Sequence, residues 1–329
     1  MRCLLVTEGG IEAGAGHLVR NLALYEALVE AGAQVEFLVN PSALARKILA
    51  QVPYEAMEWH VEWEQLRRRL KAADVVCVDS YLATPPLLDA LAAESRCLFI
   101  DDGCRHPYAK GIVANGAPYA HELAYQPAPE VTHCLGPQFA LLRRPFWNMA
   151  PKLIRADVEQ LLVTLGGTDP RQLTASVVQT LVQAYPWMEK WVVVGAGCRS
   201  LKEIRRVADR TTHIIETPDA PQMACLMQEV DLAISAGGQT LHELARVGTP
   251  TIALGVAENQ RRSIAAYEGR KLMASAGWWD EGNWPSQLTR AVDRMGDPIG
   301  RARQSQGLRR LFDGQGARRI AQQLLSGNP

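Results

Sequence analysis

Residues 3–39 decide the fold, and they read CLLVTEGGIEAGAGHLVRNLALYEALVEAGAQVEFLV. The apolar run at residues 3–7 predicts a buried strand, and residues 35–39 predict the next one. Between them a glycine-rich loop opens a helix whose apolar residues recur at helical spacing, and Gly32 is placed to end that helix. A strand, a helix and a second strand in this order predict a right-handed βαβ unit and a parallel sheet.

The alternation continues along the chain, lapses once and restarts. Residues 75–78 and 97–100 repeat the strand pattern, whereas residues 143–155 contain two prolines and predict a linker. Beyond the linker we expect strands at 161–165, 191–194, 213–215, 232–235 and 251–254, and helical stretches at 170–184 and 301–325. We therefore expect an α/β protein with two doubly wound, Rossmann-like domains facing each other across a cleft. The domains are predicted at residues 1–148 and 149–329, with the C-terminal helix packing back towards the first.

Composition excludes several classes of protein. Of the 329 residues, 47% are hydrophobic and 21% are charged, so the chain is neither disordered nor collagen-like. Lys plus Arg and Asp plus Glu both number 35, so the chain lacks the positive excess of a nucleic-acid binder. No apolar run approaches 18 residues, which argues against membrane insertion. The seven cysteines are scattered and form no C-x-x-C pair, so we expect a reducing cytoplasm and no zinc.

The first candidate loop is Gly14-Ala15-Gly16-His17, after the first strand. It gives G-x-G, but Val19 stands where a dinucleotide-binding fingerprint needs its third glycine, so a dehydrogenase is disfavoured. His17 is expected to face the cleft beside backbone N–H groups that favour negative charge. The alternative is that His17 only caps or packs the start of the helix.

Two further glycine-rich loops follow predicted strands of the second domain. In Gly166-Gly167-Thr168-Asp169 the glycines allow close backbone approach, and ligand contact and simple helix capping are equally good interpretations. In residues 235–243, small residues expose N–H donors suited to a diphosphate without any metal. Glu243, one turn into the following helix, can accept hydrogen bonds from a ribose diol or act only as a capping carboxylate.

Familiar metal and nucleophile motifs are absent from the sequence. Neither His121-Glu122 nor His242-Glu243 has the second histidine of H-E-x-x-H, and there is no Walker loop or G-x-S-x-G elbow. Asp101 and Asp102 can attract a cation, but adjacent carboxylates at a strand end point in different directions. We expect neither a metal nor a cofactor.

Several motifs occur in an order that is familiar. They are Gly14-Ala15-Gly16-His17-Leu18-Val19-Arg20, Asp79-Ser80-Tyr81, Asp101-Asp102, Leu165-Gly166-Gly167-Thr168-Asp169, Ser235 to Glu243, Glu258-Asn259-Gln260 and Asp313-Gly314-Gln315-Gly316-Ala317. Over nearly the whole chain this set resembles the nucleotide-sugar hydrolases of the pseudaminic acid pathway and their spore-coat polysaccharide relatives. The resemblance implies the two-domain GT-B fold of the family 28 glycosyltransferases. It also implies metal-independent, inverting cleavage of UDP-2,4-diacetamido-2,4,6-trideoxy-β-L-altropyranose at its anomeric carbon.

The resemblance assigns roles to individual residues. His17 matches the catalytic histidine that assists the attacking water, and Glu243 matches the ribose-binding glutamate. Tyr81 and Asn259 match sugar-site positions, and the backbone near Ile215 matches the uracil contact. The full set that we expect to contact substrate, besides His17, is Glu8, Gly14, Gly16, Arg20, Tyr81, Asp102, Gly166, Gly167, Thr168, Ile215, Ser235, Gly237, Gly238, Gln239, Glu243, Asn259 and Gln260.

One departure from the family concerns the first loop. Members commonly have Arg and Asp where this chain has Val6 and Glu8. Glu8 can substitute for the Asp, but the loss of the Arg leaves the identity of the sugar open. Three hypotheses follow: a UDP-sugar hydrolase, a GT-B glycosyltransferase with the same UDP-sugar donor, and a non-catalytic UDP-sugar-binding protein.

The charge is distributed unevenly, because residues 1–150 carry a net charge of −4 and the rest +4. The positive second half suits a diphosphate ligand. The acidic first half would be repelled by an anionic membrane, which favours the hydrolase over a membrane-docked transferase.

Overall fold

The computed structural model describes residues 1–10 and 13–326, and the chain divides into two compact units. Unit 1 comprises Met1–Arg144 and Gly314–Pro329, and unit 2 comprises Pro145–Asp313. Each unit is built around one sheet whose paired strands all run parallel. The predicted α/β class with two doubly wound sheets is confirmed.

In unit 1 the strand order is β3-β2-β1-β4-β5-β6-β7. The strands are β1 Arg2–Thr7, β2 Gln34–Val39, β3 Tyr54–Ala56, β4 Val75–Asp79, β5 Cys97–Ile100, β6 Lys110–Asn115 and β7 Glu130–Leu135. The helices are α1 Gly16–Glu30, α2 Ala43–Ile48, α3 Trp63–Lys71, α4 Pro85–Glu94 and α12 Gly316–Leu325. Short 3-10 turns lie at Ala120–Glu122 and Pro137–Phe139.

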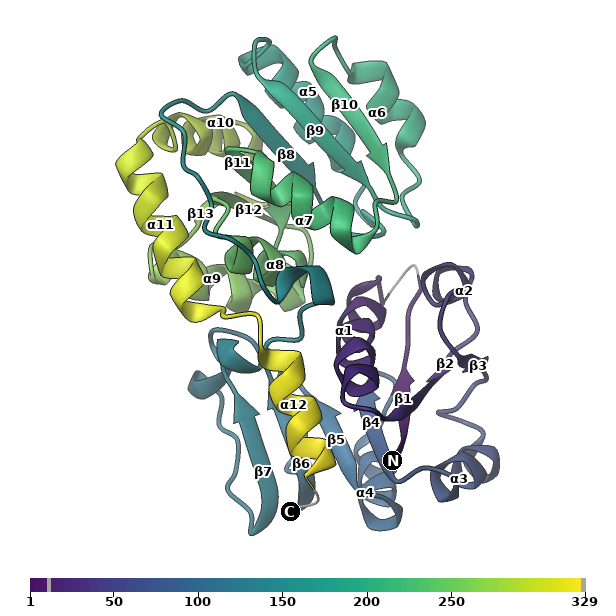
Figure 1. The fold of residues 1–329 in the computed structure, drawn as a ribbon. Helices are drawn as coiled ribbons and strands as arrows, with labels where there is room; N and C mark the ends of the chain where they lie inside the picture. Colours follow the sequence, from purple (N-terminus) through teal and green to yellow (C-terminus); the bar gives the residue numbers. More distant parts are fainter. Residues whose placement is uncertain (11–12, 327–329) are drawn as a thin grey trace. The chain divides into compact units, whose positions relative to one another are not determined.

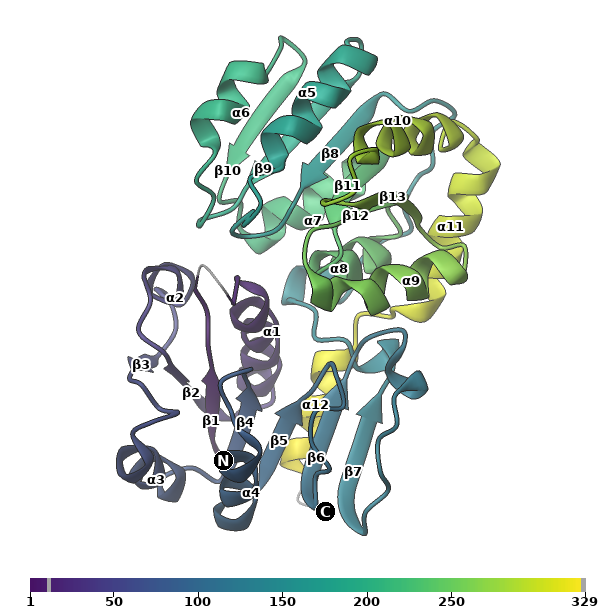
Figure 2. The same ribbon diagram turned by 180° about the vertical axis from the view of Figure 1, so that it is seen from behind.

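The helices of unit 1 cover both faces of its sheet. Helix α12, from the C-terminal end of the chain, packs along α1 on one face, and α3 and α4 cover the other (Figures 1 and 2). The core beneath α3 and α4 is apolar and includes Trp59, Leu66, Leu70, Leu91 and Phe99. Burying such side chains stabilises the unit by about 1.5–3 kcal/mol each relative to leaving them exposed.

In unit 2 the strand order is β10-β9-β8-β11-β12-β13. The strands are β8 Gln160–Thr164, β9 Glu189–Val194, β10 Thr212–Glu216, β11 Leu232–Ala236, β12 Thr251–Gly255 and β13 Ala274–Trp278. The helices are α5 Thr174–Ala184, α6 Leu201–Val207, α7 Ala220–Glu229, α8 Thr240–Val247, α9 Arg261–Gly269, α10 Trp284–Arg294 and α11 Pro298–Leu311. Helices α5, α6 and α10 pack together, as do α7, α8 and α11, because right-handed crossovers change face when the strand order reverses (Figure 1).

Each sheet therefore has a switch point, where successive connections leave in opposite directions. In unit 1 it lies between β1 and β4, and in unit 2 between β8 and β11. Loops after the two strands diverge there, and open α/β sheets bind their ligands in the crevice between such loops. The fold thus directs attention to the residues that follow β1, β4, β8 and β11.

Two predicted helices have different limits in the structure. The helix predicted at 170–184 begins only at Thr174, because Asp169 and Gln172 adopt positive φ and hold the intervening residues in a turn. The stretch predicted as helical at 301–325 is two helices, α11 and α12, separated by residues 312–315 with Gly314 at φ +82°. Strands β3, β6, β7 and β13 were not predicted.

Candidate active site

The switch point of unit 1 brings together residues from the ends of three strands and the start of α1. Thr7 of β1 pairs with Asp79 of β4, so the loop after β1 and the end of β4 are neighbours. The loop is closed on itself, because the amides of Gly10 and Gly14 each donate to the carbonyl of the other residue. Gly14 adopts φ +74°, and Gly16 is the first residue of α1. His17 therefore begins the helix directly above the end of β4.

His17 and Asp79 form a buried pair. The ring atom Nδ1 of His17 lies 2.7 Å from Oδ1 of Asp79, and the side chains are 6% and 0% exposed. Asn21, one turn further along α1, donates to Oδ2 of Asp79 over 2.7 Å. Since an ionised carboxylate only accepts, the proton of this hydrogen bond lies on Nδ1, and in the neutral ring Nε2 keeps its lone pair. Asp79 therefore fixes the orientation and the tautomer of the neutral His17 ring.

Arg20 joins this pair to a second carboxylate. It donates through Nε to Oδ2 of Asp79 over 2.5 Å, through Nη2 to Oδ1 of the same carboxylate, and through Nη1 to Asp102 over 2.5 Å. Burial by itself raises the pKa of Asp79, but the charges and hydrogen bonds of Arg20 and His17 hold it well below its ordinary value. Burial likewise lowers the pKa of Arg20, and Asp102 and Asp79 more than offset this. Asp79 is therefore ionised across the physiological pH range.

Glu8 and Tyr81 complete this group of residues. The amide of Tyr81 donates to Oε1 of Glu8 over 2.6 Å, and the rings of Tyr81 and His17 are nearly perpendicular with centroids 4.7 Å apart. The guanidinium of Arg105 lies over the Tyr81 ring, 4.8 Å from its centroid. Glu8, His17, Arg20, Tyr81 and Asp102 thus come together as we expected from the sequence, and we call this group with Asp79 the His17 site.

Three residues that lie at the His17 site were missed. Asp79 was named only within the motif Asp79-Ser80-Tyr81, while Asn21 and Arg105 were given no role. The available signal was the acidic residue at a strand end, because carboxyl ends of parallel strands meet at one edge of a sheet. The adjacent carboxylates do point apart: Asp102 pairs with Arg20, whereas Asp101 accepts the amides of Gly103 and Arg105. No group of three metal-ligating side chains occurs among the residues that the structure describes.

The switch point of unit 2 is built from glycine-rich loops, which we call the glycine-loop site. After β8, Gly166 adopts φ +91° and the carbonyl of Gly167 accepts the amide of Gly197 over 2.9 Å. Thr168 is buried, and the carboxylate of Asp169 accepts the amides of Leu173 and Thr174. The capping interpretation of this loop therefore holds for Asp169, and Gly166 has open space around its Cα.

The second loop of this site follows β11 and leads into α8. Gln260 shapes it, because its side-chain oxygen accepts the amides of Gly237 and Val256 over 3.1 and 3.0 Å. A Cβ on Gly237 would lie 2.8 Å from Gln260 and Ile264, whereas nothing lies within 4 Å of one on Gly238. Ser235 is fully buried and donates to the carbonyl of Ala236. The open side of the loop is therefore at Gly238, next to the start of α8 at Gln239 and Thr240.

Three more predicted contacts lie around this edge of the sheet. Glu243 is 3% exposed, in the first turn of α8. Asn259 is exposed in the 3-10 turn Glu258–Gln260 that follows β12. Ile215 is half-buried on β10, separated from β8 by β9, which places it about 10 Å along the sheet. A contact between Ile215 and the nucleobase thus requires a nucleotide that extends along this edge of the sheet from Gly238.

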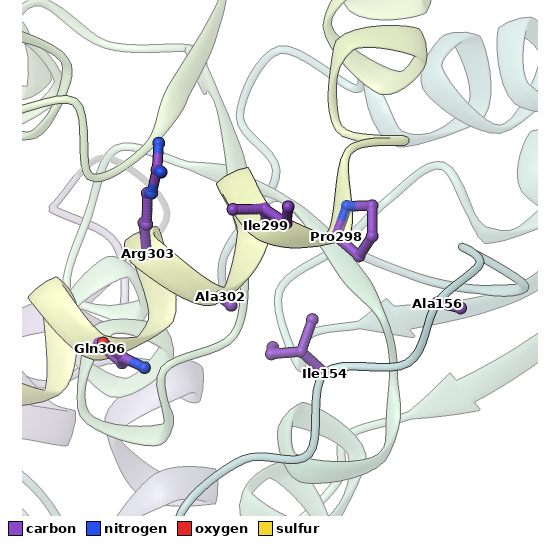
Figure 3. Close-up of a pocket in the computed structure, with 7 residues that line it drawn as sticks. All are labelled: Ile154, Ala156, Pro298, Ile299, Ala302, Arg303 and Gln306. Atoms are coloured by element: carbon purple, nitrogen blue, oxygen red, sulfur yellow. The ribbon is translucent and has the colours of Figure 1, made fainter.

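A separate hollow lies at the opposite edge of unit 2. It has a volume of about 510 Å³ and lies between residues 154–156, which precede β8, and the first turns of α11 (Figure 3). Ile154, Pro298 and Ile299 line it, and Ile299 is 63% exposed. Because it lies at the amino end of β8, it is distinct from the glycine loops.

No helix in residues 1–10 and 13–326 is long and apolar enough to cross a membrane.

Comparison with curated proteins identifies two relatives, although no family model matches the chain. The spore coat polysaccharide biosynthesis protein SpsG of Bacillus subtilis is 25% identical over 276 residues, which cover 80% of each chain. The uncharacterised protein MJ1062 of Methanocaldococcus jannaschii is 23% identical over 283 residues. That match covers 81% of this chain but only 58% of MJ1062, so the chain spans under two thirds of that relative.

Solved structures share the fold over nearly the whole chain. The MurG of Acinetobacter baumannii has a TM-score of 0.66 at 15% identity, covering 99% of this chain and 100% of its own. The spinosyn rhamnosyltransferase SpnG, complexed with thymidine diphosphate, also has a TM-score of 0.66 at 15% identity, covering 97% and 99%. The expected similarity to spore-coat proteins is confirmed, while a relation to the pseudaminic hydrolases is not. The chain is thus similar in sequence to SpsG and shares the two-sheet fold of the GT-B glycosyltransferases.

Proposed function

We propose that this protein cleaves the anomeric C–O bond of a sugar carried on a nucleoside diphosphate, with His17 as general base. The observation that carries the proposal is the buried hydrogen bond between His17 Nδ1 and Asp79, which leaves Nε2 free to accept a proton. A diphosphate is a good leaving group, so the remaining requirement is a hydroxyl nucleophile and a base within hydrogen-bond reach. Nε2 of His17 meets the requirement for a base.

The glycine-loop site supports the nucleotide half of the proposal. Gly166 and Gly238 leave room for close backbone approach, and Gly238 lies at the N-terminus of α8, where N–H groups and the helix dipole favour negative charge. Such groups stabilise a departing diphosphate without a metal. We infer that Glu243 accepts hydrogen bonds from the ribose hydroxyls and that the nucleobase lies towards Ile215. Uridine diphosphate follows from the family resemblance, and thymidine diphosphate is the alternative because SpnG binds it.

Two nucleophiles fit the chemistry. Transfer to the hydroxyl of an acceptor is favoured by the fold. The structural neighbours SpnG and CalG4 are a rhamnosyltransferase and a glycosyltransferase by name. Hydrolysis by water is favoured by the enclosure of the base, because the His17 residue is 5% exposed and its ring is flanked by Tyr81 and Glu8. In either case we place unit 1 on the sugar side and assign the nucleotide to unit 2.

The biological setting follows from the same reasoning. We propose a cytoplasmic enzyme of surface-polysaccharide or nonulosonic acid synthesis that acts on an amino or deoxy sugar, as SpsG homology and the seven unpaired cysteines suggest. Val6, where the resembling family has Arg, is the departure that leaves the choice of sugar open, since Glu8 can substitute for the family's Asp.

A panel of nucleotide sugars tests the proposal. Purified protein is incubated with UDP- and dTDP-linked sugars, with and without sugar or lipid alcohols as acceptors, and products are followed by NMR. Release of nucleoside diphosphate without an acceptor indicates hydrolysis, and release only with an acceptor indicates transfer. His17→Ala should lower turnover by about 10²–10⁴-fold while leaving nucleotide affinity unchanged. His133→Ala, on the outer strand β7, is the matched control, and full activity of His17→Ala contradicts the proposed base.

A further inference from the structure

Glu8 is a buried carboxylate that the base mechanism alone does not use. It directly follows β1, is 4% exposed, and its Oε1 accepts the amide of Tyr81. Among residues 1–10 and 13–326, that amide is the one hydrogen-bond donor recorded for this carboxylate. A buried carboxylate needs more than one donor to offset the loss of its hydration. Glu8 is therefore prepared to accept a further hydrogen bond.

The atom that faces Glu8 is the free nitrogen of His17. Oε1 of Glu8 lies 3.9 Å from Nε2 of His17, which is too long for a direct hydrogen bond. Because Nδ1 donates to Asp79, Nε2 is itself an acceptor. Two acceptors thus face each other across a gap: Oε1 of Glu8 already accepts the amide of Tyr81 and has a second lone pair, and Nε2 of His17 can accept one donor.

The gap has the dimensions of a single oxygen atom that carries two protons. If an oxygen atom lies about 2.8 Å from both acceptors, the acceptor–oxygen–acceptor angle is about 90°. The two O–H bonds of a water molecule can point to both acceptors at this angle. An alcohol has a single O–H and can satisfy only one of the two acceptors. We propose that Glu8 and His17 together bind the nucleophilic water, so that Glu8 selects water over an alcohol.

This inference rests on the proposed cleavage reaction and names its nucleophile. The water oxygen forms the new bond to the anomeric carbon, while the bond from that carbon to the diphosphate oxygen breaks and its electron pair leaves with the diphosphate. One water proton passes to Nε2 of His17, which becomes an imidazolium paired with Asp79. The second proton stays on the new sugar hydroxyl, which donates to Glu8 as the product forms. The imidazolium then returns its proton to solvent.

Crystallography tests the water site without any substrate. In crystals of the wild-type protein, an ordered water should lie within hydrogen-bond distance of both Nε2 of His17 and Oε1 of Glu8. Glu8→Gln retains the shape and the acceptor for the Tyr81 amide, so the water should persist. In Glu8→Ala it should be lost or displaced from Nε2. A well-ordered His17 site with no water between these two atoms in the wild-type protein overturns the inference.

Partitioning between water and methanol tests the selection. With a nucleotide sugar that the enzyme cleaves, products are measured at a fixed methanol concentration as the ratio of methyl glycoside to free sugar. Glu8→Ala should reduce hydrolysis by about tenfold to a hundredfold and raise this ratio, because a hydrogen bond to a charged group is lost only for water. For Glu8→Gln, the ratio should lie between that of the wild-type protein and that of Glu8→Ala. An unchanged ratio in both variants overturns the inference.

The design separates this inference from the function on which it rests. Glu64→Ala, an exposed carboxylate on α3, serves as the control and should leave the ratio unchanged. His17→Ala should reduce both products together, since it removes the base that either nucleophile uses. If the wild-type protein cleaves no nucleotide sugar, the proposed function fails, and the crystallographic water still decides whether Glu8 and His17 form a water site.

Discussion

The two switch points of this molecule have the same topology but are built from different groups. In unit 1 the site consists of charged side chains, with Asp79 completely buried and bonded to His17, Arg20 and Asn21. In unit 2 it consists of backbone at glycines, where Gly166 adopts positive φ and Gly238 faces open space. The same topology thus provides the groups for the proton transfer that we propose where side chains converge, and for the anion binding that we propose where they are absent. Substitutions that remove side-chain charges or hydrogen bonds should impair the His17 site, and substitutions that add side-chain atoms to the glycines should impair the glycine-loop site.

The largest effect is expected for Asp79→Asn. The amide cannot hold the Nδ1 proton of His17 as a carboxylate does, so turnover should fall by about 10²–10⁴-fold. Removing the Asp79 charge leaves Arg20 paired with Asp102, so the free energy of unfolding should fall by less than the roughly 3–5 kcal/mol that a fully unpaired buried charge costs. Turnover is measured by diphosphate release, and stability by denaturant unfolding.

Asp74→Asn is the control for this variant. Asp74 is an exposed carboxylate in the same unit that accepts the amide of Arg2. It should retain full turnover. Loss of nucleotide affinity in Asp79→Asn as large as its loss of turnover would remove the distinction between the two sites.

In unit 2 the sharpest comparison is between neighbouring glycines. A methyl group on Gly237 meets Gln260 and Ile264 at 2.8 Å, so Gly237→Ala should lower both the melting temperature and the nucleotide affinity. On Gly238 it meets no protein atom, so Gly238→Ala should leave the melting temperature unchanged while it weakens uridine diphosphate binding about tenfold or more. Calorimetric titration and thermal melts measure both. Normal binding by Gly238→Ala would show that the backbone there does not approach the ligand.

The sequence was most informative where a pattern is local. The β1-α1-β2 unit could be predicted because apolar periodicity and the stop at Gly32 lie within one short segment. Strand β7 could not, because an edge strand is half solvated and its polar Glu130, Thr132 and His133 hide the alternation. The late start of α5 depends on positive φ at Asp169, a conformation that residue type alone does not specify.

The candidate site divides in the same way. His17 and the glycine loops could be predicted because each motif is continuous in the sequence. The pairing of His17 with Asp79 could not, because it spans 62 positions and depends on β4, rather than another strand, lying beside β1. Gln260 was predicted as a ligand contact, and in the structure its side-chain oxygen accepts two loop amides. Such a role depends on the loop geometry, which the sequence does not state.

A smaller effect is expected for Glu243→Gln. If Glu243 accepts the two ribose hydroxyls, the neutral amide should weaken uridine diphosphate binding by about five- to tenfold, since hydrogen bonds to a charged acceptor are the stronger kind. Binding of inorganic pyrophosphate, which has no ribose, should not change. Glu268→Gln, an exposed carboxylate on α9, is the control. Equal weakening of both ligands would assign Glu243 to the fold of the loop rather than to the ribose.

The pH dependence of stability should fall in different pH ranges for the two units, because a buried carboxylate with a lowered pKa acts in acid and a buried amine with a lowered pKa acts in alkali. In both ranges stability rises with pH. The pKa of Asp79 lies well below its ordinary value, so the unfolded chain takes up this proton first, and unit 1 loses stability as the pH falls below about 4. In unit 2, burial lowers the pKa of Lys152 to about 8, and its amine donates to the carbonyls of Met227 and Gln228. Between about pH 8 and pH 10.5 the unfolded chain binds more protons there, so unit 2 gains stability as the pH rises.

Urea unfolding with a tryptophan signal from each unit measures these two dependences, Trp59 reporting on unit 1 and Trp284 on unit 2. Each group contributes a slope of at most about 1.4 kcal/mol per pH unit, which corresponds to one proton. Lys152→Met should abolish the alkaline gain and leave the acid loss intact, whereas Asp79→Asn should weaken the acid loss and leave the alkaline gain intact. An alkaline gain that persists in Lys152→Met would show that another group in unit 2 carries it. The pair of variants therefore tests whether the two units respond to charge as independently as their separate cores suggest.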